Sequence, residues 1–166
     1  MPAPQTLMSH AAKVLSEPEF TDAATSANVC YARLWRYFAM LKGAVLYAKD
    51  LKKLRAFYLA IGGKQTDGID GEFAAISNAD TELIILQVPQ TIAPQIVIED
   101  PPVVRSGTPM KPIISTISIA DVLEILPEIG GRPVPDMKQW KFRQNLVQDI
   151  VDPEGNVVQL WQPESS

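Results

Sequence analysis

The residue types that most often perform chemistry are sparse in this sequence. There is one cysteine, Cys30, and one histidine, His10, which is too few for a His-rich metal site or a His-based catalytic triad. Cys30 lies among apolar residues, which favours a packed side chain over a nucleophile. Paired carboxylates for acid–base catalysis stay open, because Glu72, Glu82 and Asp149 fall on expected strands, although surface placement is the simpler interpretation for each.

Two glycine pairs are the only candidates for a phosphate-binding loop. Gly62-Gly63 and Gly130-Gly131 lack the spacing of nucleotide- and dinucleotide-binding loops and are typical of helix ends. The net charge is −4, the pI is about 5.0, and no block of Lys or Arg exceeds two residues. These features argue against a nucleic-acid partner, and we expect no cofactor.

The sequence also bears on the compartment. A single cysteine cannot form an internal disulfide, which fits a reducing environment. The first 15 residues lack the basic region and apolar run of a secretory signal, and no stretch reaches the roughly 20 apolar residues that span a bilayer. We therefore expect a cytoplasmic protein without a membrane partner.

Residues 1–41 are expected to form an N-terminal extension. Within it, the apolar positions 30, 31, 34, 35, 38 and 41 follow the spacing of one helical stripe. The segment 28–41 is therefore predicted to be an amphipathic helix that packs on the domain or on a second subunit. Membrane-surface binding through Arg33 and Arg36 is the weaker alternative, because a short helix with two cations supplies little affinity.

From residue 42 the pattern predicts two similar modules. In module one, 42–89, a strand at 43–48 precedes a helix at 51–61 with Asp50 as its N-cap, and strands follow at 64–66, 72–77 and 82–88. The linker 90–111 is rich in proline and is not expected to form central strands. In module two, 112–166, a strand from 112 leads to a helix capped by Asp121, an uncertain strand before Trp140 that Pro133 and Pro135 interrupt, and strands at 146–151 and 157–161.

The turn and strand at residues 152–161, Asp-Pro-Glu-Gly-Asn-Val-Val-Gln-Leu-Trp, resemble the closing motif of the glyoxalase/bleomycin resistance protein/dioxygenase (vicinal oxygen chelate) superfamily. The run 47–51 followed by Phe57-Tyr58 and Gly62-Gly63 is similar to that superfamily's first strand and helix, and 130–132 to its second helix end. The resemblance covers roughly 120 residues. It implies an α+β fold of two βαβββ modules whose curved mixed sheets form a cup, here with an extra N-terminal helix.

Strand alternation assigns side chains to the cup or to the helices. In the run 113–119, Ile114, Thr116 and Ser118 are assigned to the cup and the odd-numbered residues to the helix side. The expected ligand-binding residues are Val45, Tyr47, Gln87, Thr116, Ser118, Trp140, Gln159 and Trp161. Whether one chain or two copies complete the cup is left open.

The resemblance also bears on metal binding, because metal-using members hold their ion with His and Glu on the first, fourth, fifth and eighth strands. The equivalent positions here are Gly43, Ile85, Ile114 and Gln159. None is an imidazole or an anionic donor, whereas a transition-metal site wants about three to four such ligands. The resemblance therefore implies a member without the metal.

Three hypotheses for function remain. The favoured one is a metal-free protein that binds or sequesters a small molecule, aromatic or cationic, as bleomycin-resistance proteins do. The alternatives are a lyase or dioxygenase-like enzyme of the same superfamily with non-standard ligands, and a non-catalytic dimeric interaction protein. A homodimer is expected in each case, because pairing would protect open sheet edges.

Overall fold

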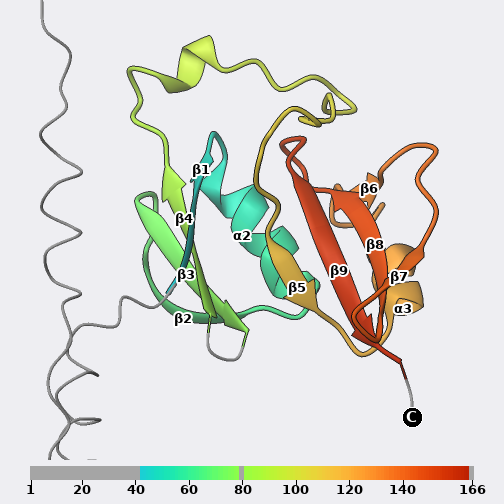
Figure 1. The fold of residues 1–166 in the computed structure, drawn as a ribbon. Coiled ribbons are helices and arrows are strands. Elements are labelled where there is room, and N and C mark those ends of the chain that lie inside the picture. The colour runs from blue at the N-terminus through green and yellow to red at the C-terminus, as the bar shows by residue number, and fades with distance from the viewer. Residues whose placement is uncertain (1–41, 79–80, 165–166) are drawn as a thin grey trace, which may run out of the picture. The chain divides into compact units, whose positions relative to one another are not determined.

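The computed structural model describes residues 42–78 and 81–164 (Figure 1). The predicted helix at 28–41, with Cys30, and the segment that holds His10 lie outside the described residues. No helix within the described residues is long and apolar enough to cross a membrane.

The first half forms sheet A and one helix. Its elements are β1 (Gly43–Ala48), α2 (Leu51–Ala60), β2 (Lys64–Ile69), β3 (Phe73–Asn78) and β4 (Thr81–Gln87). The strand order is β1-β4-β3-β2, with β1 parallel to β4 and the other pairs antiparallel. As predicted, α2 begins after Asp50, whose Oδ1 accepts a hydrogen bond from the Lys53 backbone N–H at 3.0 Å.

The second half forms sheet B and a shorter helix. Its elements are β5 (Ile113–Ser115), α3 (Ile119–Ile125), β6 (Arg132–Pro133), β7 (Trp140–Phe142), β8 (Asn145–Val151) and β9 (Val157–Pro163). The order is β5-β9-β8-β6, and β7 pairs with the other end of β8. The uncertain strand before Trp140 is thus two short pieces, because the chain leaves β8 around Pro135 and Asp136.

The connector 88–112 contains no strand and one short 3₁₀ helix, η1 (Ala93–Gln95). Its prolines lack the N–H donors that a central strand needs. It is tied to the β8–β9 turn, because Arg105 donates its backbone N–H to the Gly155 carbonyl at 2.8 Å. Thr108 Oγ1 donates to the Arg105 carbonyl at 2.9 Å.

Two details of module two differ from the prediction. The N-cap of α3 is Ser118, whose Oγ accepts from the Asp121 backbone N–H at 3.2 Å, so Asp121 lies in the first turn rather than at the cap. The face assignment of β5 is wrong as well. Ile114 packs against the core, while Ile113 and Ile117 are exposed. Alternation favoured the odd-numbered positions, three of which are Ile, but the register with β9 sets the face and pairs Ile114 with the core residue Leu160.

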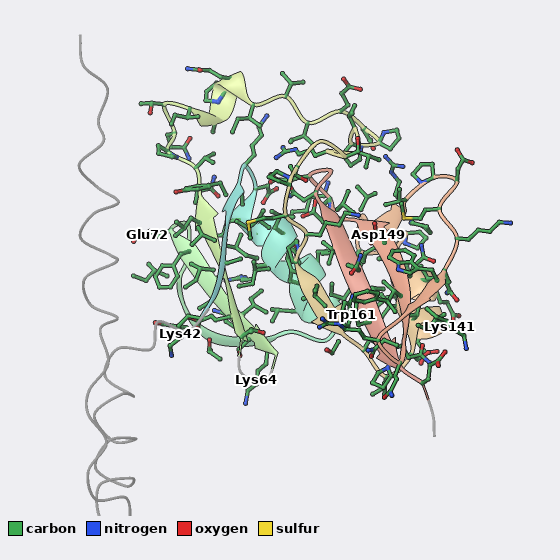
Figure 2. The ribbon with its side chains drawn as sticks, viewed as in Figure 1. Lys42, Lys64, Glu72, Lys141, Asp149 and Trp161 are labelled. Atoms are coloured by element: carbon green, nitrogen blue, oxygen red, sulfur yellow. The ribbon has the colours of Figure 1, made fainter. Side chains whose placement is uncertain are left out.

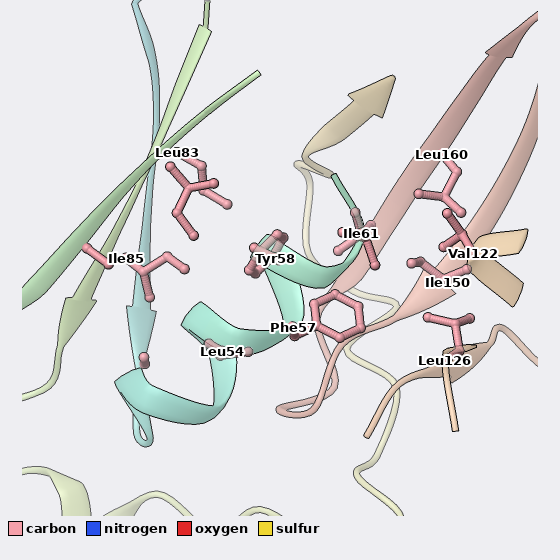
Figure 3. Packing of buried hydrophobic residues seen from close by; sticks show 14 of the residues in the cluster. Leu54, Phe57, Tyr58, Ile61, Leu83, Ile85, Val122, Leu126, Ile150 and Leu160 are labelled. Atoms are coloured by element: carbon pink, nitrogen blue, oxygen red, sulfur yellow. The ribbon is translucent and has the colours of Figure 1, made fainter. Parts of the chain in front are cut away.

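Helix α2 lies between the two sheets, and the core is built around it (Figure 3). Leu83 and Ile85 reach it from sheet A, and Ile150 and Leu160 from sheet B. The helix comes so close to the second half that a Cβ on Gly131 would lie 2.6 Å from Phe57 Cε2. The two modules therefore share one core.

The Asp-Pro-Glu-Gly-Asn turn adds a polar connection between the modules. The buried Glu154 side chain accepts hydrogen bonds from the backbone N–H groups of Lys49 (3.1 Å) and Asp50 (2.7 Å), just before α2. Within the turn, Asp152 Oδ1 accepts from the backbone N–H groups of Glu154 and Asn156, each at 2.9 Å. We call Glu154 and its two donors the inter-module clasp.

Candidate functional site: the outer faces of the two sheets

Each sheet has one face against the helices and an outer face that points away from them. Residues paired across neighbouring strands share a face, so the registers define both outer faces. The outer face of sheet A includes Val45, Tyr47, Phe73, Ala75, Glu82, Ile84 and Leu86. The outer face of sheet B includes Ile113, Ser115, Trp140, Phe142, Val147, Asp149, Gln159 and Trp161.

Both outer faces expose large apolar side chains. On sheet A, Val45 is 56% and Tyr47 62% exposed, and on sheet B Ile113 is 53% and Phe142 48% exposed. Exposed apolar side chains on the face of a sheet are typical of binding surfaces. Because α2 lies between the sheets, the two outer faces point away from each other within one chain.

Three aromatic side chains, Trp140, Phe142 and Trp161, lie on the outer face of sheet B, where Figure 2 labels Trp161. Trp140 and Trp161 flank Val147 on neighbouring strands. The rings of Phe142 and Trp161 meet edge to face, with centroids 5.5 Å apart, and the Arg143 guanidinium lies 5.6 Å from the Phe142 centroid. This arrangement offers ring faces and edges to an apolar ligand.

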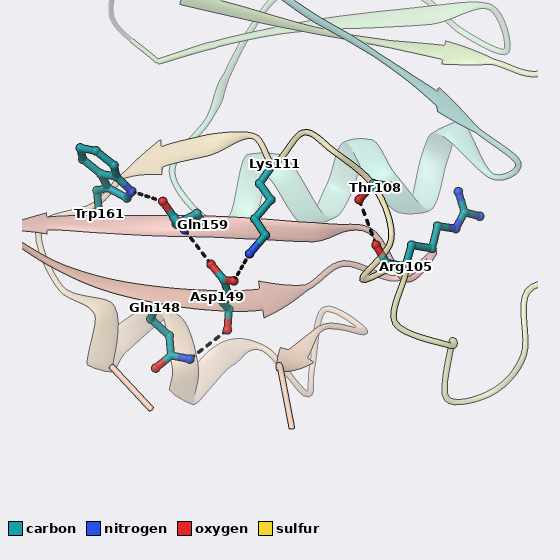
Figure 4. Close-up of polar contacts among 7 residues, drawn as sticks. All are labelled: Arg105, Thr108, Lys111, Gln148, Asp149, Gln159 and Trp161. Atoms are coloured by element: carbon teal, nitrogen blue, oxygen red, sulfur yellow. Dashed lines mark hydrogen bonds and ion pairs between the residues drawn. The ribbon is translucent and has the colours of Figure 1, made fainter. Parts of the chain in front are cut away.

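A chain of polar contacts runs along the same face (Figure 4). Lys111 Nζ donates to Asp149 Oδ2 at 2.5 Å, and Gln159 Nε2 donates to Asp149 Oδ1 at 3.0 Å. Trp161 Nε1 donates to Gln159 Oε1 at 2.6 Å. We call Lys111, Asp149, Gln159 and Trp161 the polar network.

Asp149 is fully buried, contrary to the expected surface placement. A buried carboxylate costs several kcal/mol unless it is paired and hydrogen-bonded. Lys111, which is 39% exposed, supplies the opposite charge from the connector, and the Gln159 amide supplies the second hydrogen bond. Lys111 is held near β9 because the Gln159 backbone N–H donates to the Pro112 carbonyl at 2.9 Å.

The structure brings only some of the predicted ligand-binding residues together. Val45 and Tyr47 lie on the outer face of sheet A, and Trp140, Gln159 and Trp161 on that of sheet B. The other three have local roles, which the following hydrogen bonds describe.

Gln87 lies on the helix side of β4. Its Oε1 accepts from the Leu51 backbone N–H at 3.1 Å, and its Nε2 donates to the Lys49 carbonyl at 2.8 Å. Ser118 caps α3, and Thr116 Oγ1 donates to the Ser118 carbonyl at 3.2 Å. These three side chains hold turns and helix ends.

Of the four positions expected to correspond to metal ligands, two face the core and two face outward. Ile85 and Ile114 point into the core, so neither faces the outer side. By register, the outer-face pairs are Gly43 with Glu82 and Ile113 with Gln159.

These residues do not fit a metal ion. A Cβ on Gly43 would collide with the Glu82 carbonyl, so that position has no room for a ligating side chain. The Gln159 oxygen already accepts from Trp161 and its nitrogen donates to Asp149. Within residues 42–78 and 81–164, no group of three or more His, Cys, Asp or Glu side chains is placed to hold a metal.

A cavity of about 630 Å³ lies away from both outer faces, beside the start of α2. Its lining combines Lys49, Asp50 and Lys53 with Glu154 of the clasp and Glu99 of the connector. The charges are of both signs, and Glu154 is engaged in the inter-module clasp, so this cavity does not define a ligand class.

Asp152 and Asn156, which lie on either side of Glu154 in the chain, form a buried hydrogen-bonded group with Tyr58. The Tyr58 hydroxyl donates to Asp152 Oδ2 at 3.2 Å, and Asn156 Nδ2 donates to the same oxygen at 2.8 Å. Burial raises the pKa of Asp152 although these hydrogen bonds lower it. Burial, reinforced by the nearby Asp152 charge, also raises the pKa of Tyr58 well above its ordinary value.

No family model and no curated protein matches the chain in sequence. Solved structures match it in fold. A hypothetical protein, SA1046 from S. aureus, aligns with a TM-score of 0.56 and 15% identity over 78% of this chain and 98% of its own. A glyoxalase-related enzyme from Fulvimarina pelagi aligns with a TM-score of 0.54 and 15% identity over 75% of this chain and 88% of its own.

A glyoxalase/bleomycin resistance protein/dioxygenase family enzyme from Burkholderia phytofirmans PsJN aligns with a TM-score of 0.50 and 13% identity, over 75% of this chain and 98% of its own. The chain has the vicinal oxygen chelate fold. The resemblance seen in residues 152–161 is thereby confirmed at the level of fold, and the α+β architecture of two βαβββ modules with it. At 13–15% sequence identity, these similarities support a shared fold and no statement about function.

Sequence reasoning missed Asp149 and Lys111 as partners and Phe142 as part of the aromatic group. For Asp149 a signal existed, because a charged residue between valines and isoleucines in a strand is seldom buried without a partner. For Lys111 there was none. It lies in the proline-rich connector, 38 residues from the carboxylate that it pairs with.

Proposed function

We propose that this protein binds a small aromatic molecule, without a metal, in a cup formed between the outer face of sheet A in one copy and that of sheet B in a second copy. The supporting observation is the exposure of large apolar side chains on both outer faces, which point away from each other in one chain. A second copy would cover these side chains and place two apolar walls opposite each other.

The residues on the two outer faces are better suited to ligand binding than to catalysis. Tyr47, Phe142 and Trp161 provide rings, and the polar network provides fixed hydrogen-bonding groups. A metal-dependent lyase or dioxygenase reaction has little support, because Gly43 and Gln159 cannot act as ligands as they are arranged.

The oligomeric state tests the shared cup. We expect wild-type protein to be a dimer in sedimentation equilibrium and V45K, on the outer face of sheet A, to be monomeric at micromolar concentration. V97K is the matched control, because Val97 is 80% exposed but lies on the connector. A wild-type monomer at all concentrations would contradict the shared cup.

Ligand binding tests the second half of the proposal. Aromatic compounds should raise the midpoint of thermal unfolding of wild type and V97K, because a ligand that binds the folded protein stabilises it. They should not raise the midpoint of V45K, because a monomer lacks the shared cup. A dimer that no aromatic compound stabilises would favour the interaction-protein alternative instead.

A further inference from the structure

The charged groups on the outer face of sheet B bear on whether a ligand there carries a positive or a negative charge. The Asp149 carboxylate is fully buried and both of its oxygens are engaged, one by Lys111 and one by Gln159. Because the side chain is fully buried, a cation from a ligand could reach it only by displacing one of these partners. The carboxylate therefore holds Lys111 in place rather than offering a negative charge to the cup.

The amide and the indole N–H are also in use. Gln159 donates to Asp149 and accepts from Trp161 Nε1, so the Trp161 N–H is directed at a protein oxygen. An ammonium group has three N–H donors, and one from Lys111 reaches Asp149. Lys111, which is 39% exposed, is thus the cationic group of the polar network and keeps N–H donors that can point outward.

Nearby residues add positive charge and aromatic surface. Arg143 lies over the Phe142 ring, whose edge meets Trp161. Lys141, on β7, forms an ion pair with Glu164 at 2.6 Å. The Lys111 ammonium is linked to Trp161 through Asp149 and Gln159, and the Arg143 guanidinium lies over Phe142. This combination of cations and rings matches a planar apolar molecule that carries an anionic group.

We propose that the ligand class of this face is an aromatic anion, such as an aryl carboxylate or sulfonate, with its anionic group on the Lys111 ammonium and its rings on Trp161 and Phe142. This inference rests on the proposed small-molecule function and names its ligand class. It replaces the expected cationic ligand, which rested on the resemblance to bleomycin-resistance proteins rather than on the charges of this face.

Two fluorescent probes test the charge directly in the full chain. 8-Anilinonaphthalene-1-sulfonate and N-phenyl-1-naphthylamine share their rings and differ by the sulfonate. A charge-assisted hydrogen bond is worth about tenfold or more in affinity, so the sulfonate probe should bind at least about tenfold more tightly to wild type.

The matching variant is K111M/D149N, which removes the cation without leaving a buried charge and keeps the net charge. It should bind both probes with the affinity of the neutral probe, whereas K111R should keep the tighter sulfonate binding. K141M/E164Q is the control, because it removes the other ion pair of sheet B with the same net charge and should change neither affinity.

The outcomes separate the two proposals. If both probes bind wild type equally, or if K111M/D149N keeps the sulfonate preference, the role of Lys111 is wrong while the small-molecule function stands. Tighter binding of the cationic dye thioflavin T than of the sulfonate would likewise overturn the anionic class. If neither naphthyl probe binds, the aromatic cup itself is wrong and the inference falls with it.

Discussion

The inter-module clasp makes a quantitative prediction for the variant E154A. Glu154 is 4% exposed, and its carboxylate accepts from two backbone N–H groups, at 2.7 Å from Asp50 and 3.1 Å from Lys49. Hydrogen bonds to a charged group contribute about 1.5–3 kcal/mol each, and buried donors left unpaired cost a similar amount. E154A should therefore lower the free energy of unfolding by about 3–5 kcal/mol.

A loss of this size is large against the roughly 5–15 kcal/mol that stabilises a typical domain. It should lower the midpoint of thermal unfolding by about 10 °C or more, which circular dichroism can measure. E154Q keeps one acceptor oxygen without the charge, so we expect about half of the effect.

The control is E99A. Glu99 lines the same cavity as Glu154 and carries the same charge, but it is exposed. Its removal should change stability by less than about 0.5 kcal/mol. If E154A and E99A unfold at the same temperature, the clasp contributes nothing and the shared apolar core alone holds the two modules together.

Three further substitutions test other parts of the fold. G43A should cost about 1–3 kcal/mol because its Cβ would press on the Glu82 carbonyl, whereas G107A, with open space around it, should be close to neutral in urea unfolding. Q144G should stabilise by about 1 kcal/mol, because Gln144 holds a φ of 59° that glycine adopts without strain; an unchanged urea midpoint would argue against this. Burial raises the pKa of Asp152, so its contribution to stability is lost as pH rises through that pKa; D152N should remove this slope in urea titrations that start at about pH 4, near the ordinary pKa of Asp.

The elements that the sequence predicted well have strong local signals. Asp50 caps α2 and Gly62 follows its end with a φ of 109°, a backbone conformation that favours glycine. The last strand alternates as expected, with Val158 and Leu160 in the core and Gln159 and Trp161 on the other side. In both cases the residues concerned are close together in the chain.

The failures have a common physical cause, which is that the deciding partner is distant in sequence. The face of β5 is set by its register with β9, in which Ile113 pairs with Gln159 and Ile114 with Leu160. Gln87 was expected to face the cup, yet its amide is held by the backbone at the start of α2. Neither contact leaves a trace in the local pattern of apolar and polar residues.

Strand alternation also separates the residues that stabilise the fold from those that meet a ligand. In β9, Leu160 belongs to the core, while Gln159 and Trp161 belong to the outer face. A ligand-facing side chain can therefore change without disturbing the core beside it. Asp149 is the exception, because it is fully buried although it belongs to the outer face, and it depends on Lys111 for its charge balance. Neither the Lys111 charge nor the Asp149 charge can thus be removed alone, which ties the charge offered to a ligand to the stability of sheet B.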